Sequence, residues 1–297
     1  MTNASAIARG LLGAASVGDG PTPEQTGLLQ NLLHGYLGVD LDVASLTPLD
    51  PAALATAVDE ADRSRVVDLL IVLEFCRHPA DPVQADRVEE YARALGVDES
   101  LLVVGRDALT ATRAEVMADW GRFREASILE PGVTEADPAL GARLRALGTC
   151  PDGSLGRAYF EFLDRWHLAF PGEPGGGDAG LVAHDFSHVL AGYDADAPGE
   201  LALQAMLTSA TDFEHHFSGL VASLSLYEVG MFDILEITPT VAALDRPGAA
   251  ALLAEAFARG AQCTADFSLV DHLARANDPL ESVRADCGIR PRAPSAP

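Results

Sequence analysis

A repeated signal for the start of a helix is the strongest constraint on the fold of this chain. Thr22, Asp50, Asp81 and Asp137 are each followed directly by proline. A Thr or Asp side chain can accept a hydrogen bond from a free backbone amide of the first helical turn, and proline is favoured at the first helical position because its missing amide hydrogen is not needed there. The sequence therefore predicts that a helix begins at each of these four points.

Helical periodicity of apolar residues continues between these starts, and no run of alternating β-branched residues indicates a strand. The expected fold is therefore all-α. In the first half we expect helices over residues 4–16, 23–37, 51–59, 61–77, 82–95 and 106–123. In the second half we expect helices over residues 138–147, 154–166, 181–192, 200–209, 211–237 and 247–259, followed by short helices at the end.

The chain has 297 residues, which is long enough for two domains that each bury a core. Helical periodicity is interrupted between residues 123 and 137, where Pro131 and Gly132 stand together. We therefore predict two helical domains, an N-terminal one over residues 1–125 and a C-terminal one over residues 126–297.

Two segments of the first half share one organisation. Residues 14–37 and 73–95 each run from a helix through a polar turn with proline into an amphipathic helix that ends near Leu-Gly. This pattern resembles the TerB-like fold of tellurite-resistance proteins, a small helical module whose acidic turns are proposed metal sites. Only the first acidic turn is recognisable, over residues 19–24, because residues 78–83 have a different character. The resemblance therefore implies a structural or partner-binding N-terminal domain.

The second half carries a pattern with the spacing of a metal site: His184, Asp185 and His188, followed after eleven residues by Glu200. Residues four apart in a helix lie on one face, so both imidazoles would project in the same direction. Asp185 would point roughly 100° away, either as a ligand or as an orienting carboxylate. Residues 192–199 indicate a turn, and Glu200 would open the next helix and return its carboxylate to the histidine pair.

Two imidazoles and one carboxylate suit a divalent metal, with positions left open for substrate. Zinc is the first choice, and iron, manganese and cobalt are the alternatives. The structural alternative is a polar patch on a helix surface. A zinc protease is disfavoured because Asp185 stands where that signature has glutamate and because the sequence after His188 lacks the Gly-x-x-His continuation. A phosphohydrolase of the HD type would need further upstream histidines and a distal aspartate.

This spacing, His-Asp-x-x-His, eleven residues and then Glu, resembles the signature of the Coq-four family of ubiquinone (coenzyme Q) biosynthesis proteins. The resemblance covers residues 130–292, with further matching segments at residues 151–164, 199–203 and 278–289. The chain departs from the family at two places. Residues 171–180 form a glycine-rich stretch before the first histidine, and Gln204 to Met206 replace the usual Trp-Phe pair of the second metal helix. These departures concern the substrate more than the metal.

The resemblance implies a metal-dependent enzyme that acts on a prenylated hydroxybenzoate-type ring by removing the ring carboxylate, with hydroxylation at that carbon. Because of the departures, an aromatic natural product is an alternative substrate. A non-catalytic scaffold that binds lipid and organises a biosynthetic complex is the alternative from another class of protein.

Three residues are candidates for catalysis. Asp185 lies between the two predicted histidine ligands. His215, one helix beyond Glu200, is either a general base, a further ligand or a surface residue. Tyr193, like Tyr227, could donate a hydrogen bond to a phenolic or quinone oxygen, although a buried tyrosine with a satisfied hydroxyl is the ordinary alternative.

Charge excludes several other functions. The formal net charge is −24, and all twenty basic residues are arginine. Nucleic-acid binding is disfavoured because phosphate contact needs a positive surface. Schiff-base chemistry and phosphate loops are excluded because both need lysine. The expected ligand is a hydrophobic or prenylated aromatic small molecule, and the expected protein partners are other biosynthetic proteins and further copies of this chain.

The sequence predicts a cytoplasmic protein with at most peripheral contact at the inner face of the membrane. Four scattered cysteines (Cys76, Cys150, Cys263 and Cys287) are typical of a reducing compartment, and residues 1–20 lack an export signal. The longest apolar stretch, residues 217–237, contains three acidic residues. Each charge near the centre of a bilayer costs at least a few kcal/mol, so this stretch indicates a buried helix.

Overall fold

The structure is a computed structural model that describes residues 3–97, 137–177, 179–210, 213–230 and 238–292. Within these ranges all of the regular secondary structure is helical, so the predicted all-α fold is confirmed. The predicted helix over residues 106–123 and the predicted domain boundary both lie outside the described residues. The division into residues 1–125 and 126–297 therefore stays a prediction.

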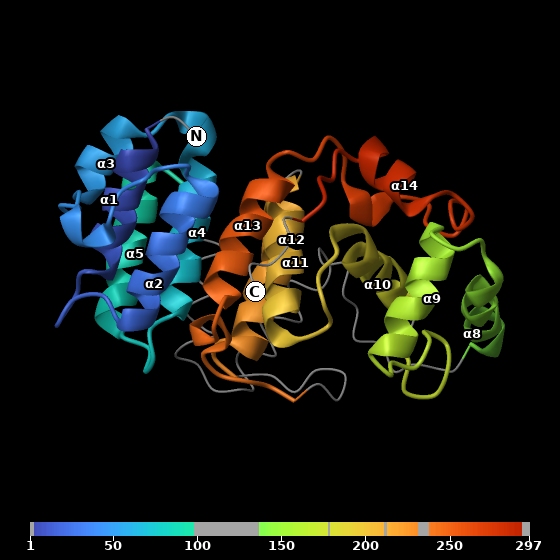
Figure 1. The fold of residues 1–297 in the computed structure, drawn as a ribbon. Helices are drawn as coiled ribbons and strands as arrows, with labels where there is room; N and C mark the ends of the chain where they lie inside the picture. Colours follow the sequence, from blue (N-terminus) through green and yellow to red (C-terminus); the bar gives the residue numbers. More distant parts are fainter. Residues whose placement is uncertain (1–2, 98–136, 178, 211–212, 231–237, 293–297) are drawn as a thin grey trace.

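The N-terminal half forms one group of helices, at the blue end of the ribbon (Figure 1). Its α-helices are α1 (Ala4–Ala15), α2 (Pro23–Asn31), α3 (Pro51–Ala57), α4 (Arg63–Phe75) and α5 (Pro82–Leu95). A π-helical turn, η1 (Leu32–Tyr36), continues α2, and η2 (Val43–Ser45) and η3 (Glu60–Asp62) are short 3-10 turns. The predicted bounds of the helix over residues 82–95 are those of α5.

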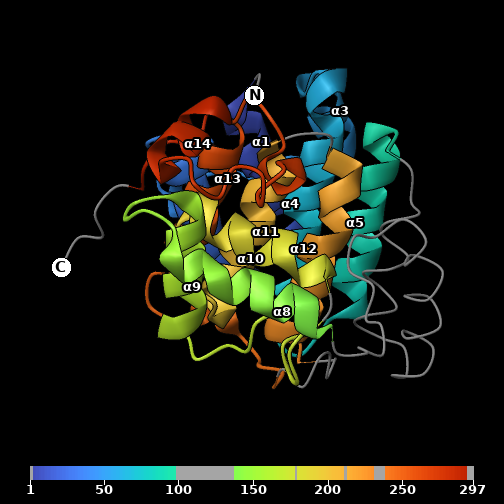
Figure 2. The ribbon, with the colours of Figure 1, turned by 90° about the vertical axis from the view of Figure 1, so that its right-hand side faces the viewer.

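The C-terminal half supplies the remaining helices. They are α8 (Pro138–Arg145), α9 (Leu155–Arg165), α10 (Gly180–Ala191), α11 (Ala197–Ala210), α12 (Phe213–Tyr227), α13 (Ala249–Gly260) and α14 (Leu280–Asp286), with 3-10 turns η4 (Ala146–Thr149), η5 (Ala243–Asp245) and η6 (Phe267–Leu269). Figure 2 shows α8 and α9 on the near face of the molecule, with α10 and α11 behind them.

All four predicted helix starts are confirmed, because each cap side chain accepts a hydrogen bond from a backbone amide of the first turn. Thr22 accepts from the Gln25 amide, and the Gln25 side chain accepts from the Thr22 amide in return. Asp50, Asp81 and Asp137 accept from amides of their own first turns. One predicted start was wrong, because α11 begins at Ala197, three residues before Glu200. The predicted helix over residues 211–237 was too long, because α12 ends at Tyr227 and residues 228–230 are not helical.

The central helices join the two halves. Helix α11 packs against both α12 and α13, while α13 packs on α2 and η1 and α12 packs on α4. The buried apolar side chains of both halves form one continuous cluster in the described part of the chain. Burial of this shared apolar surface is the main stabilising term of the fold.

Helix α10 is held from several sides by elements of the second half: α9, α11, α14 and η6. An ion pair ties η6 to α12, because Nε2 of His216 lies 2.7 Å from the Asp266 carboxylate. No described helix combines the length and the apolar character needed to cross a bilayer.

The His216–Asp266 pair predicts a loss of stability in acid. Although burial opposes the shift, hydrogen bonds from His216 and Ser268 lower the pKa of Asp266 from 3.8 to about 2. A lowered pKa stabilises the folded state above the unfolded pKa, and this contribution is lost as the pH falls from about 4 to about 2. Because solvent reaches part of the pair, we expect it to contribute about 1–2 kcal/mol to the free energy of unfolding at neutral pH.

Asp266→Asn should therefore lower the free energy of unfolding at pH 7 and flatten its decline between pH 4 and pH 2. Urea unfolding at a series of pH values measures both effects. The exposed Asp152→Asn is the control and should keep the wild-type profile. An Asp266→Asn variant with the wild-type acid profile would contradict this account of the pair.

Candidate metal centre

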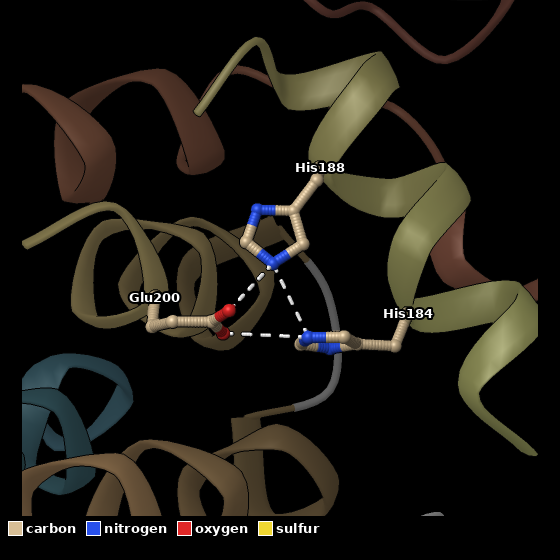
Figure 3. Close-up of side chains that lie close together, drawn as sticks. All are labelled: His184, His188 and Glu200. Atoms are coloured by element: carbon tan, nitrogen blue, oxygen red, sulfur yellow. Dashed lines mark hydrogen bonds and ion pairs between the residues drawn. The ribbon is translucent and has the colours of Figure 1, made fainter. Parts of the chain in front are cut away.

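His184, His188 and Glu200 converge on one point, as their spacing predicts (Figure 3). The Nε2 atoms of the two histidines, both on α10, lie 3.2 Å apart. Glu200, on α11, places one carboxylate oxygen 3.3 Å from His184 Nε2 and the other 3.1 Å from His188 Nε2. We call these three residues the triad.

The triad has the dimensions of a metal site. Two ligand atoms that each lie about 2.1 Å from a cation are about 3.0–3.4 Å apart when the angle between them is about 90–109°. The three measured separations, 3.1, 3.2 and 3.3 Å, fall within that interval. His184, His188 and Glu200 are therefore the residues that could hold a divalent metal.

The tautomer of His188 fits the same interpretation. Its Nδ1 atom lies 3.2 Å from the carbonyl oxygen of Tyr193, and a carbonyl oxygen only accepts, so Nδ1 must carry the hydrogen. The lone pair of a neutral ring is then on Nε2, which faces His184 and Glu200. A ligand histidine that donates its other N–H to a carbonyl is typical of metal sites, because this bond fixes both tautomer and ring orientation.

The charges of the triad shift the pKa values of Glu200 and His184. Burial alone would raise the pKa of Glu200, but the two histidines hold it well below its ordinary value. Burial lowers the pKa of His184, but the charge and hydrogen bond of Glu200, together with the charge of Asp185, outweigh burial and raise it. The triad therefore requires a positive charge among its facing acceptor atoms, which a proton or a metal cation can supply.

Burial of the triad is uneven. The side chain of His188 is 1% exposed, whereas those of His184 and Glu200 are 20% and 15% exposed. A cation held by three protein ligands with solvent access on one side keeps positions for water or substrate, which is the arrangement of catalytic rather than structural zinc sites.

The turn after α10 fixes the ring of His188. Gly192 ends the helix in the left-handed region at φ 76°, and its amide donates to the carbonyl of His188. This conformation favours glycine and folds the chain back, so that the Tyr193 carbonyl meets the His188 ring. On the other side, the ring of Phe162 from α9 stacks on His188 at a centroid distance of 5.4 Å.

Arg284 of α14 fastens the same end of α10. Its guanidinium donates to the carbonyl oxygens of Leu190 and Val189, at 3.0 and 2.9 Å. Carbonyl groups of the last helical turn have no partner inside the helix, and a positive side chain satisfies them. The C-terminal segment of the chain therefore positions the histidine helix from outside.

The start of α11 fixes Glu200. The Asp196 side chain accepts from the Gly199 amide at 2.8 Å, and its carbonyl accepts from the Glu200 amide, also at 2.8 Å. A Cβ atom on Gly199 would lie 2.0 Å from the carbonyl oxygen of Asp194. This tight turn explains why the helix begins before Glu200 and places that residue in its first turn.

Asp185, predicted as a ligand or an orienting group, lies outside the triad. The hydroxyl of Tyr159, on α9, donates to its Oδ2 at 3.4 Å. Burial raises the pKa of Asp185 from 3.8 to about 6, while the neighbouring histidines oppose the increase. Asp185 therefore lies beside the triad as a carboxyl group that can gain or lose a proton near neutral pH.

Sequence reasoning missed Tyr159 as part of this site. Its ring stacks on that of Phe186 at a centroid distance of 4.0 Å, and Phe186 stacks in turn on His272 at 4.9 Å. The only available signal was an aromatic residue in the helix that precedes the motif, and nothing local connects that residue with Asp185.

Tyr193 contributes its carbonyl group to the site. The ring lies between the guanidinium groups of Arg259 and Arg292, each 5.1 Å from its centroid. Burial raises the pKa of its hydroxyl to about 12, and the charges that act on it come from Arg259, Glu255 and Arg292, not from the triad.

Tyr227, the second tyrosine considered, lies within the electrostatic influence of the site. Burial and then the charges of Glu200 and Asp196 raise its pKa. His215 lies in the first turn of α12, where side chains are outside the described part of the structure. Its predicted role as a base or ligand stays a prediction.

Comparison with known proteins gives limited information. No protein-family model and no curated protein matches the chain, so the Coq-four-like and TerB-like assignments stay predictions. Among solved structures, a "Putative ubiquinone biosynthesis protein" from Nostoc punctiforme shares 19% identity over 75% of this chain and 97% of its own, at a TM-score of 0.34. A TM-score this low does not establish a shared fold.

Gly199→Ala should destabilise the protein, because the added methyl group overlaps the Asp194 carbonyl and the start of α11 must shift. We expect a loss of about 1–3 kcal/mol in the free energy of unfolding, as for other overpacked sites. Gly27→Ala is the matched control: Gly27 lies within α2 with open space around it, so alanine should stabilise by up to about 1 kcal/mol. Chemical denaturation of both variants measures the difference, and equal stabilities would contradict this account of the turn.

Proposed function

We propose that this chain is a metal-dependent enzyme in which His184, His188 and Glu200 hold a divalent cation. The observation that supports it most is the convergence of two imidazole nitrogens and both oxygens of one carboxylate, from two consecutive helices, with separations of 3.1–3.3 Å between the contacting atoms. Zinc suits two imidazoles and one carboxylate, and iron, manganese and cobalt suit them as well.

The substrate class in this proposal is a hydroxybenzoate-type ring with an apolar tail, and the reaction is removal of the ring carboxylate. The substrate class comes from the sequence resemblance to the Coq-four family. A bound divalent cation would act as a Lewis acid toward an oxygen of such a ring and would accept electron density as the bond to the carboxylate carbon breaks. Hydroxylation at the same carbon, which the resemblance also implies, would need dioxygen and a two-electron reductant as further substrates, because one oxygen atom enters the ring and the other leaves as water.

Decarboxylation without oxidation requires one proton at the ring. The bond between the ring carbon and the carboxylate breaks, its electron pair stays on the ring, carbon dioxide leaves, and a proton must bind the same carbon. Asp185 supports this role because its carboxyl group lies beside the triad and burial raises its pKa above the ordinary value, which favours the protonated form.

Tyr159 would position the donor. Its hydroxyl donates to Oδ2 of Asp185, which leaves the other carboxyl oxygen to carry and deliver the proton. Burial raises the pKa of Tyr159 further above its ordinary value, so the phenol stays protonated and keeps donating. The stack of Tyr159 on Phe186 restricts the orientation of the pair.

His188→Ala should abolish metal binding and turnover, because it removes a buried ligand. Metal analysis of the purified variant and release of ¹³CO₂ from a carboxyl-labelled 4-hydroxybenzoate, with and without a prenyl group, measure the two effects. The exposed His34→Ala is the matched control and should keep both. Turnover that survives in metal-free His188→Ala would overturn the enzymatic proposal.

The same assay tests the non-catalytic alternative. A scaffold whose metal is purely structural would lose stability on metal removal, and the intact wild-type protein would release no ¹³CO₂ from any ring of this class. Rings of natural-product type, tested in the same series, address the alternative substrate.

Asp185→Asn should retain the metal and lower kcat by about 10²–10³, because the amide cannot donate the proton. Metal content and steady-state kinetics measured on the same preparation separate this effect from loss of the site. Asp185→Asn with wild-type kcat would remove Asp185 from the mechanism and leave the metal proposal intact.

A further inference from the structure

A second group of ligand atoms lies at the junction of the two halves. Glu24 comes from the first turn of α2, His78 from the turn after α4, and Glu228 directly follows α12. Each offers a ligand atom within 4.8 Å of the other two. We call these three residues the junction cluster. The Nε2 atom of His78 lies 2.8 Å from Oε1 of Glu228 and 3.7 Å from Oε2 of Glu24.

Both carboxylates of the junction cluster are buried. The side chain of Glu228 is fully buried, and that of Glu24 is 10% exposed. Oε2 of Glu228 accepts from the Leu244 amide at 3.0 Å, which orients Oε1 toward His78. Oε1 of Glu24 is buried and has no hydrogen-bond partner in the described structure, and a buried carboxylate oxygen without a partner is costly.

Charge in the junction cluster is unbalanced. Glu24 and Glu228 lie within hydrogen-bond distance of each other, and Glu24 also accepts a hydrogen bond from the Asp245 amide. The charges of Glu228 and Asp245 that act on Glu24 are both negative. A single imidazole carries at most one positive charge, so it cannot neutralise both carboxylates. A divalent cation would neutralise both and would also give the unpaired Glu24 oxygen a ligand bond.

We propose that the junction cluster binds a second divalent cation, of the class that takes one imidazole nitrogen and carboxylate oxygens, such as Mn²⁺, Fe²⁺ or Zn²⁺. This site is separate from the triad. It also differs from the acidic turn predicted over residues 19–24, because the structure leaves Asp19 exposed and groups Glu24 with residues from two other segments.

The position of the junction cluster gives the cation a structural role. Glu24 and His78 belong to the N-terminal half of the chain, and Glu228 belongs to the C-terminal half. A cation held by all three would link α2 and α4 to the end of α12 across the interface seen in Figure 1.

The experiment uses the full-length chain with His184→Ala and His188→Ala, which removes the triad site. After treatment with a chelator, the protein is dialysed against Mn²⁺, and bound metal is measured by elemental analysis. We expect about one equivalent, with a single imidazole nitrogen coupled to the Mn²⁺ in pulsed electron paramagnetic resonance. Adding His78→Gln should remove that coupling and weaken binding by about tenfold or more, whereas adding His34→Gln should change neither.

A folded double variant that binds no Mn²⁺ would overturn the proposal and leave a proton shared between the two carboxylates as the remaining explanation. If the double variant fails to fold, the test moves to the wild-type chain. One equivalent less metal in His78→Gln than in the wild type supports the junction site. Equal metal content in the two proteins overturns it. Neither outcome depends on turnover, so the enzymatic proposal can fail or hold independently.

Discussion

The hydrogen bond between the His188 ring and the Tyr193 carbonyl is the interaction on which the candidate site depends. It determines which nitrogen of the ring faces His184 and Glu200. The bond forms because Gly192 reverses the chain directly after α10, so the turn that ends one helix also orients a side chain within it. The same turn leads through Gly199 into α11, which brings Glu200 back to the histidines.

Buried acidic groups are the second theme of this structure. A chain with a formal net charge of −24 has many carboxylates for its surface, yet it also buries several within the helical packing. Burying a carboxylate is unfavourable unless it is paired or bound to a cation. Glu200 faces two histidines, Asp266 faces His216, and Glu228 faces His78. The pairing of histidine with acid therefore occurs at these three places in the described structure.

The helices could be predicted well because their signals are local. A cap residue and the amide that it satisfies are two or three residues apart, so the four cap-then-proline starts needed no tertiary information. The start of α11 was less visible, because its cap, Asp196, lies in a stretch rich in Gly, Pro and Asp that resembles a longer turn. The triad was equally local in part, since two of its members are one helical turn apart and the third follows twelve residues later.

What the sequence by itself determined is therefore the helical class, most helix boundaries and the triad, because each rests on hydrogen bonds or side-chain spacing within about one or two helices. Only the tertiary structure decided that Tyr159 meets Asp185, that Arg284 holds the end of α10, and that His78 meets Glu228, a residue 150 positions away. These contacts depend on how helices pack, and packing is driven by apolar burial, which is non-directional and leaves no signature at the polar residues it brings together.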